Sequence, residues 1–213
     1  MSTTIFERSE GRHTQQRRSE RPKGDSARDV PYPVLATRRF RFRPFVFADI
    51  RRLVALAGEH RIADTTIGVP HPFTPEFARM WISSHPAEWD RRQSLHWAVH
   101  EIGNNRMMGY AGLNQIDIDR RQGELRFWVG CGAERFSCAV EWSEAIVAHG
   151  LSVFALTRIY ALQLVRHPLA GRVLAAIGMR PEGFLRKRID KSGLLEDICC
   201  WAVCSSHAQG PNS

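Results

Sequence analysis

Residues 124–153 constrain the fold most, because the spacing of their side chains changes from that of a strand to that of a helix. The first part runs Glu-Leu-Arg-Phe-Trp-Val-Gly, with Leu125, Phe127 and Val129 on one face, which is the period of a half-buried strand. The later part carries one helical stripe, formed by Ala139, Trp142, Ala145, Ile146, His149 and Val153. A strand that enters a helix through a short loop points free backbone N–H groups at whatever lies above the helix, and this geometry suits a phosphate.

The same patterns predict further elements on both sides of this segment. Strands are expected at residues 34–44, 95–99, 107–114, 158–165, 181–186 and 194–204. Helices are expected at residues 47–57, from Pro75 onward and at 169–177, with Thr74 as the cap of the second. The inward face of that second helix is predicted to carry Phe77, Met80, Trp81 and His85.

Composition indicates one folded domain with a basic balance. The chain has 213 residues, 43% of them hydrophobic, and its 30 Lys and Arg against 22 Asp and Glu give a net charge of +8. This charge suits an acidic partner such as a phosphate-bearing cofactor, and it suits ordinary solubility equally well.

The two ends of the chain differ from its centre. Residues 1–32 are expected to be a disordered tail and residues 206–213 a second tail, so that the domain occupies residues 33–205. The cysteines form no Cys-x-x-Cys pair and have no spacing to histidine that suits zinc, so no metal is expected. No apolar run has membrane-spanning length and no signal-peptide core is present, so we expect a cytoplasmic protein without a membrane partner.

Several segments resemble the GNAT superfamily of N-acetyltransferases, especially its Rim-type branch, which acetylates the N-termini of ribosomal proteins. They are the strand at 124–130, the Gly-Tyr-Ala-Gly-Leu run at 109–113, the Pro-Glu-Gly-Phe-Leu-Arg run at 181–186 and the opening strand at 34–44. The resemblance implies an α+β fold in a single domain. The sheet would be mixed, mostly antiparallel and twisted, with six or seven strands splayed at its centre and helices on both faces.

The resemblance also implies acetyl-CoA as the cosubstrate. The residues implied to bind it are Phe127, Trp128, Val129, Arg135, Phe136, Ser137, Cys138, Ala139 and His167. The cofactor loop departs from the family pattern, because Arg135 and Ser137 stand where glycines let a phosphate approach the backbone. Glu134 replaces a usual Arg or Gln and adds a charge that repels a phosphate, while Ala170 replaces a serine that could protonate the departing thiolate.

Direct acetyl transfer needs a base for the ammonium and a donor for the oxyanion. Glu124 is expected to be the base, and the backbone N–H of Val129 the oxyanion donor; the alternative for Glu124 is a rim carboxylate paired with Arg126. The acceptor would be a protein N-terminus or a small amine. The residues implied to contact it are His71, Phe73 and Trp81, for which plain packing is the alternative.

Two other functions stay open on the sequence. One is a catalytically degenerate GNAT module that binds a partner or an acyl-CoA without turnover. The other is nucleic-acid binding by the basic tail and the alternating Phe and Arg of residues 39–43, which we do not expect because a half-buried strand explains that pattern. His96 and His100 are expected to be exposed on their strand, and the chain is expected to be a monomer or a homodimer.

Overall fold

A computed structural model describes residues 31–130, 134–191 and 193–205. The strands are β1 (Leu35–Ala36), β2 (Phe40–Pro44), β3 (Leu95–Glu101), β4 (Met107–Asp117), β5 (Gln122–Val129), β6 (Arg158–Leu164), β7 (Arg180–Lys191) and β8 (Leu194–Cys204). The helices are α1 (Ile50–Ala57), which follows a short 3₁₀ turn, η1 (Phe47–Asp49), and then α2 (His60–Thr65), α3 (Pro75–Asp90), α4 (Arg135–Ser152) and α5 (Pro168–Ala176).

The described strands form one sheet of eight, in the order β1-β2-β3-β4-β5-β6-β8-β7. All neighbours are antiparallel except β5 and β6, so the mixed, mostly antiparallel sheet is confirmed. The expected count of six or seven strands was too low, because the segment at 34–44 folds into two paired strands.

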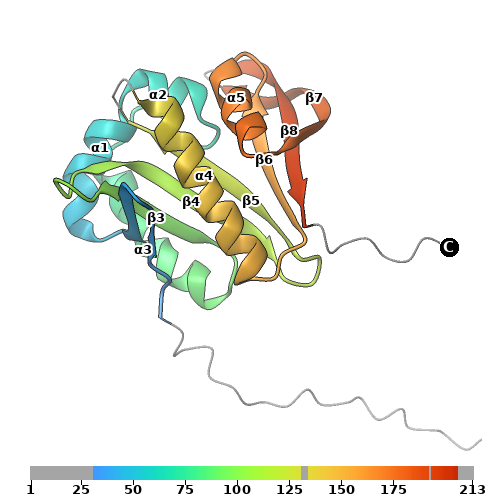
Figure 1. Cartoon of the computed structure of the whole chain (residues 1–213). Helices are drawn as coiled ribbons and strands as arrows, with labels where there is room; N and C mark the ends of the chain where they lie inside the picture. The colour runs from blue at the N-terminus through green and yellow to red at the C-terminus, as the bar shows by residue number, and fades with distance from the viewer. Residues whose placement is uncertain (1–30, 131–133, 192, 206–213) are drawn as a thin grey trace, which may run out of the picture.

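Helices cover both faces of the sheet, as predicted. Trp142 and Ile146 of α4 are fully buried against one face, together with the side chains of Leu95, Leu113 and Leu125. Figure 1 shows α4 crossing this face over β4 and β5. The second core contains α1, α2 and α3 and packs on the other face, against Ala98, Tyr110 and Trp128.

The pairing of β5 with β6 is short, and this opens the sheet at its centre. Their parallel register runs only from Gln122 opposite Arg158 to Glu124 opposite Tyr160. In the part of the chain that the structure describes, the rest of β5, from Leu125 to Val129, has no partner on the β6 side. The two strands diverge like the arms of a V, and the N-terminus of α4 lies at its wide end (Figure 1).

Local signals placed most helices correctly and missed some details. Thr74 caps α3 as predicted, since its side chain accepts a hydrogen bond from the backbone N–H of Phe77. The short helix α2 was not predicted, and α4 begins at Arg135, five residues before the expected start at Val140. Met80 and Val153 were predicted to face the core, but they are 63% and 66% exposed.

The segment before β1 is packed onto the domain. Tyr32, which the sequence placed at the end of the tail, contacts the rings of Trp89 and Trp97. Its hydroxyl also accepts a hydrogen bond from the backbone N–H of His96 at 2.6 Å and donates one to the carbonyl of His96 at 3.0 Å. The proposed tails at 1–30 and 206–213 lie outside the described residues. No helix in the described part of the chain combines the length and apolar character needed to cross a membrane.

Candidate active site

A cavity of about 570 Å³ lies where β5 and β6 diverge. Of the residues predicted to form the site, those that line this cavity are Phe73, Trp81, Glu124, Phe127, Trp128, Val129, Arg135, Ala139 and His167. Four others are not part of the lining: His71, Phe136, Ser137 and Cys138. His71 is exposed beside His60, whereas Cys138 is buried in the core between α4 and the sheet.

Glu124 is buried at the closed end of the opening. It lies opposite Asn114 of β4 and Tyr160 of β6, and it is only 2% exposed. Its Oε2 accepts a hydrogen bond from Arg126 Nη2 at 2.8 Å, so the pairing with Arg126 is confirmed and the rim position is wrong. The Nε of Arg126 is buried without a hydrogen-bond partner among the described residues. The role of Glu124 as a base stays a prediction.

A second polar cluster lines the same cavity and was missed in the sequence. His96 and His100 were expected to be exposed, but each is only 4% exposed, because α1 and α3 cover this face of the sheet. His96 Nε2 lies 2.8 Å from Glu88 Oε2 of α3, and His96 Nδ1 lies 3.1 Å from the hydroxyl of Tyr110. No local pattern indicates this cluster, since β3 and α3 are brought together only by the tertiary fold.

The charges in this second cluster are strongly perturbed. The hydrogen bond to His96 is the main reason why the pKa of Glu88 is lowered to about 2. The hydrogen bond from the Ser84 hydroxyl lowers this pKa further, while burial acts in the opposite direction. Burial raises the pKa of Tyr110, so its phenol stays protonated. His85 stacks on His96 with ring centroids 4.1 Å apart, and burial together with the charge of His96 lowers the pKa of His85 to about 3.

At the wide end of the opening, the charges of the cofactor loop at the start of α4 are arranged in a way that the sequence does not predict. The Glu134 carboxylate does not stand alone, because Arg39 Nη1 lies 2.8 Å from its Oε2. Arg135 lines the cavity and makes no hydrogen bond or ion pair within the described residues. The first turn of α4 therefore combines free N–H groups with one available guanidinium, which is the chemistry that binds a phosphate.

His167 caps α5 at the side of the same cavity. Its Nδ1 accepts a hydrogen bond from the backbone N–H of Ala170 at 3.3 Å, so the ring proton of the neutral imidazole is on Nε2. Burial lowers the pKa of His167, which favours this neutral form. His167 is thus a hydrogen-bond donor at the edge of the opening.

Comparison with known proteins identifies the class of this fold and site. Residues 39–180 match the family model of the acetyltransferase (GNAT) domain. The chain belongs to the GNAT acetyltransferase family, whose members use acetyl-CoA. The curated relative described as uncharacterized N-acetyltransferase YoaA of Bacillus subtilis (strain 168) is 21% identical over 172 residues, which cover 81% of this chain and 97% of the relative.

Solved structures agree with this fold. The ribosomal-protein-S5-alanine acetyltransferase of Vibrio fischeri superposes with a TM-score of 0.70 at 17% identity, covering 84% of this chain and 100% of that one. The spermidine N-acetyltransferase of Vibrio cholerae, in complex with CoA and spermine, gives a TM-score of 0.69 at 16% identity and covers 78% and 96% of the two chains. Within the described residues no three His, Cys, Asp or Glu side chains gather as a metal site would require.

Proposed function

We propose that this protein is an acetyl-CoA-dependent N-acetyltransferase that transfers acetyl directly to a primary amine, at a protein N-terminus or on a small molecule. The observation that carries the proposal is the divergence of β5 from β6. It opens one cavity that reaches from the first turn of α4 to the buried carboxylate of Glu124. Relatives named for a ribosomal protein and for spermidine support both acceptor classes.

The residues along the opening fit acetyl-CoA. The backbone of Phe127, Trp128 and Val129 is unpaired on the β6 side within the described chain, so a pantetheine arm can lie along it as an added strand. The first turn of α4 and Arg135 can hold the pyrophosphate, since the charge of Glu134 is matched by Arg39. His167 Nε2–H can donate to a pantetheine carbonyl, and the N–H of Val129 can donate to the oxyanion.

The acceptor side is formed by aromatic rings and carboxylates. Phe73, Trp81 and Trp128 line the cavity on the α3 side, and such rings bind a cationic amine by their π faces. Glu124 adds a buried negative charge that holds the ammonium next to the thioester. Glu124 and the imidazole of His96 are both positioned to take the proton of that ammonium.

In the reaction the free amine attacks the thioester carbonyl carbon. The tetrahedral oxyanion forms on the Val129 N–H, the C–S bond breaks, and the thiolate takes the second proton that the nitrogen loses. Ala170 has no proton to give, so this proton reaches the thiolate from the nitrogen, through water or through His167.

The test is acetyl-CoA binding followed by turnover. Acetyl-CoA should raise the melting temperature, and release of CoA thiol should be seen with a panel of N-terminal peptides and polyamines. Arg135→Ala should weaken acetyl-CoA binding about tenfold through the lost phosphate contact, while Arg38→Ala, at an exposed position near β2, should not. Binding without turnover on the whole panel would favour the degenerate module, and no thermal shift at millimolar acetyl-CoA would overturn the cosubstrate.

A further inference from the structure

The acceptor end of the cavity holds a hydrogen-bonded row that ends in a carboxylate. Glu88 Oε2 contacts His96 Nε2 at 2.8 Å, His96 Nδ1 contacts the Tyr110 hydroxyl at 3.1 Å, and that hydroxyl donates to Asn114 Oδ1 at 2.9 Å. Glu88, His96, Tyr110 and Asn114 all line the cavity that also contains Glu124.

Each member of this row is fixed by other contacts. The Ser84 hydroxyl donates to Glu88 Oε1 at 2.6 Å, and the Tyr32 hydroxyl binds both backbone groups of His96. Gly112 leaves the room for the Tyr110 hydroxyl, because a Cβ at this position would lie 2.3 Å from that oxygen. The fold therefore holds this hydroxyl over the sheet, between His96 and the strand that carries Glu124.

The contacts of Tyr110 define two states that differ by one proton. A tyrosine has a single hydroxyl proton, so it cannot donate to Asn114 and to His96 at once. When it donates to Asn114 Oδ1, an imidazolium can donate from Nδ1 to the phenol oxygen and from Nε2 to Glu88. A neutral ring can instead accept at Nδ1 from the Asn114 side-chain N–H at 3.4 Å. When the hydroxyl donates to His96 Nδ1, the imidazole is neutral and the phenol oxygen can accept a proton from the cavity.

We propose that Tyr110 and His96 form a relay that takes the proton of the acceptor ammonium, with Glu88 as the residue that positions and charges His96. The inference rests on the acetyl transfer proposed above. In the step, the phenol oxygen takes one proton from the ammonium as its own proton passes to His96 Nδ1. Tyr110 is unchanged, the amine is neutral, and one positive charge has moved to the imidazole; water removes that proton after the product leaves.

The surrounding charges favour His96 over Glu124 for this proton. Protonation of Glu124 would remove the buried counter-charge of Arg126, which costs stability, whereas a proton on His96 lies beside Glu88. The titratable groups that face the imidazole are Glu88 and His85 of α3 and Tyr110 of β4, with Arg126 and Glu124 beyond Tyr110 on β5. Burial and the charge of His96 lower the pKa of His85 to about 3, so at neutral pH His85 carries no charge that would repel one on His96.

The experiment is the pH profile of kcat for wild type, Tyr110→Phe and Glu88→Gln. We expect Tyr110→Phe to lower kcat about a hundredfold at neutral pH. The logarithm of its kcat should then rise with pH at unit slope up to the pKa of the acceptor amine, since only the free amine reacts. Glu88→Gln keeps the shape and should move the acid limb of kcat to lower pH, because the imidazolium loses its counter-charge. Tyr160→Phe is the matched control, since among the described residues its hydroxyl donates to Gln115 alone and its loss should change neither kcat nor the acid limb of the profile.

Acetyl-CoA affinity and circular dichroism of each variant show that it is folded. If Tyr110→Phe and Glu88→Gln keep kcat within threefold of wild type and the same acid limb, the relay is wrong and Glu124 takes the proton. If wild type itself transfers acetyl to no acceptor, the proposed function fails, which is a separate outcome from failure of the relay.

Discussion

Arg39 and Glu134 form an ion pair of 2.8 Å although 95 positions separate them in the chain. The same guanidinium contacts Glu141 of α4 at 2.7 Å. Arg39, which directly precedes β2, thus binds the carboxylate at the N-cap of α4 and a second one inside that helix. The charge of Glu134 is consequently matched by a guanidinium from a distant part of the chain.

The first prediction concerns the effect of this pair on acetyl-CoA. Arg39→Met should weaken acetyl-CoA binding about fivefold, since an unmatched, solvated carboxylate near a phosphate costs on the order of 1 kcal/mol. The double variant with Glu134→Gln should regain most of the affinity. Isothermal calorimetry measures the acetyl-CoA affinity of wild type, the two single variants and the double variant, with Arg38→Met as the control. Equal affinity in Arg39→Met and wild type would show that the phosphates lie elsewhere.

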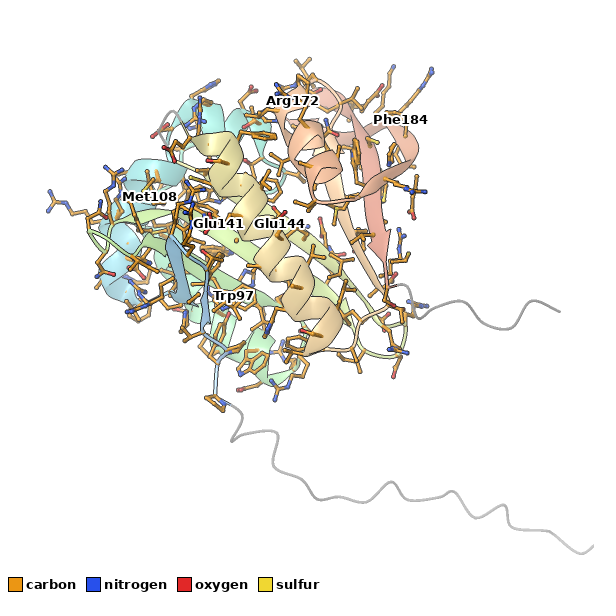
Figure 2. The ribbon with its side chains drawn as sticks, in the orientation of Figure 1. Trp97, Met108, Glu141, Glu144, Arg172 and Phe184 are labelled. Atoms are coloured by element: carbon orange, nitrogen blue, oxygen red, sulfur yellow. The ribbon has the colours of Figure 1, made fainter. Side chains whose placement is uncertain are left out.

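The second prediction concerns Glu124 as the group that holds the ammonium. Glu124→Gln keeps an acceptor for Arg126 but removes the charge, so KM for the amine should rise about ten- to a hundredfold, the usual range for a charged hydrogen bond. Steady-state kinetics at saturating acetyl-CoA measures this. Glu144→Gln, on the exposed side of α4 (Figure 2), is the control. If Glu124→Gln lowers kcat and leaves KM unchanged, Glu124 acts as the base and does not serve to bind the ammonium.

The third prediction follows from the buried imidazole of His85, whose two nitrogens have no hydrogen-bond partner among the described residues. Burial lowers its pKa from 6.5 to about 3. Between these values the unfolded chain binds a proton that the folded chain does not, so stability falls as the pH decreases from 6.5 towards 3. His85→Leu removes this group at similar volume.

Urea unfolding of the two proteins tests the sign and the size of this effect. From pH 6.5 to pH 5, wild type should lose roughly 1.5 kcal/mol more unfolding free energy than His85→Leu. Parallel losses in both proteins would mean that His85 titrates normally in the folded state.

The fourth prediction separates the N-terminal residues from the domain. Deletion of residues 1–30 should leave the melting temperature and the cooperativity of unfolding nearly unchanged, since their composition does not support a core. Tyr32→Ala should instead cost about 2–3 kcal/mol, through lost packing on Trp89 and Trp97 and the lost bonds to His96. Thermal and urea unfolding measure both. If the deletion destabilises the domain as much as Tyr32→Ala does, residues 1–30 contribute to the stability of the fold and the prediction is wrong.

Side-chain periodicity was sufficient to predict most of the strands and helices, because alternation along β5 and the helical stripe of α4 are local properties of the sequence, whereas the arrangement of the strands in the sheet followed from the resemblance to the family. Thr74 and Pro75 likewise predicted the start of α3, because capping involves only neighbouring residues. The position of Glu124 in the cavity followed from the resemblance to the family. These features needed no knowledge of distant parts of the chain.

The features that the sequence did not predict all depend on distant contacts. His96 and His100 alternate with apolar residues and so looked exposed, but α1 and α3 bury that face. The charge of Glu134 could be judged only with Arg39 in place. Phe136 is absent from the cavity lining, and the guanidinium of Arg172 of α5 (labelled in Figure 2) lies over its ring at 5.4 Å; its role in cofactor binding stays a prediction.

The early end of the pairing between β5 and β6 has a consequence for how far such sequences can diverge. The opening depends on where backbone hydrogen bonds stop, and the groups that it leaves free are peptide N–H and C=O groups, which every residue other than proline supplies. Side chains from Leu125 to Val129 can therefore be exchanged without closing it. This explains how structures only 16–17% identical to this chain keep TM-scores of 0.69–0.70. In this architecture the opening is set by strand register, and the side chains around it can change without closing it.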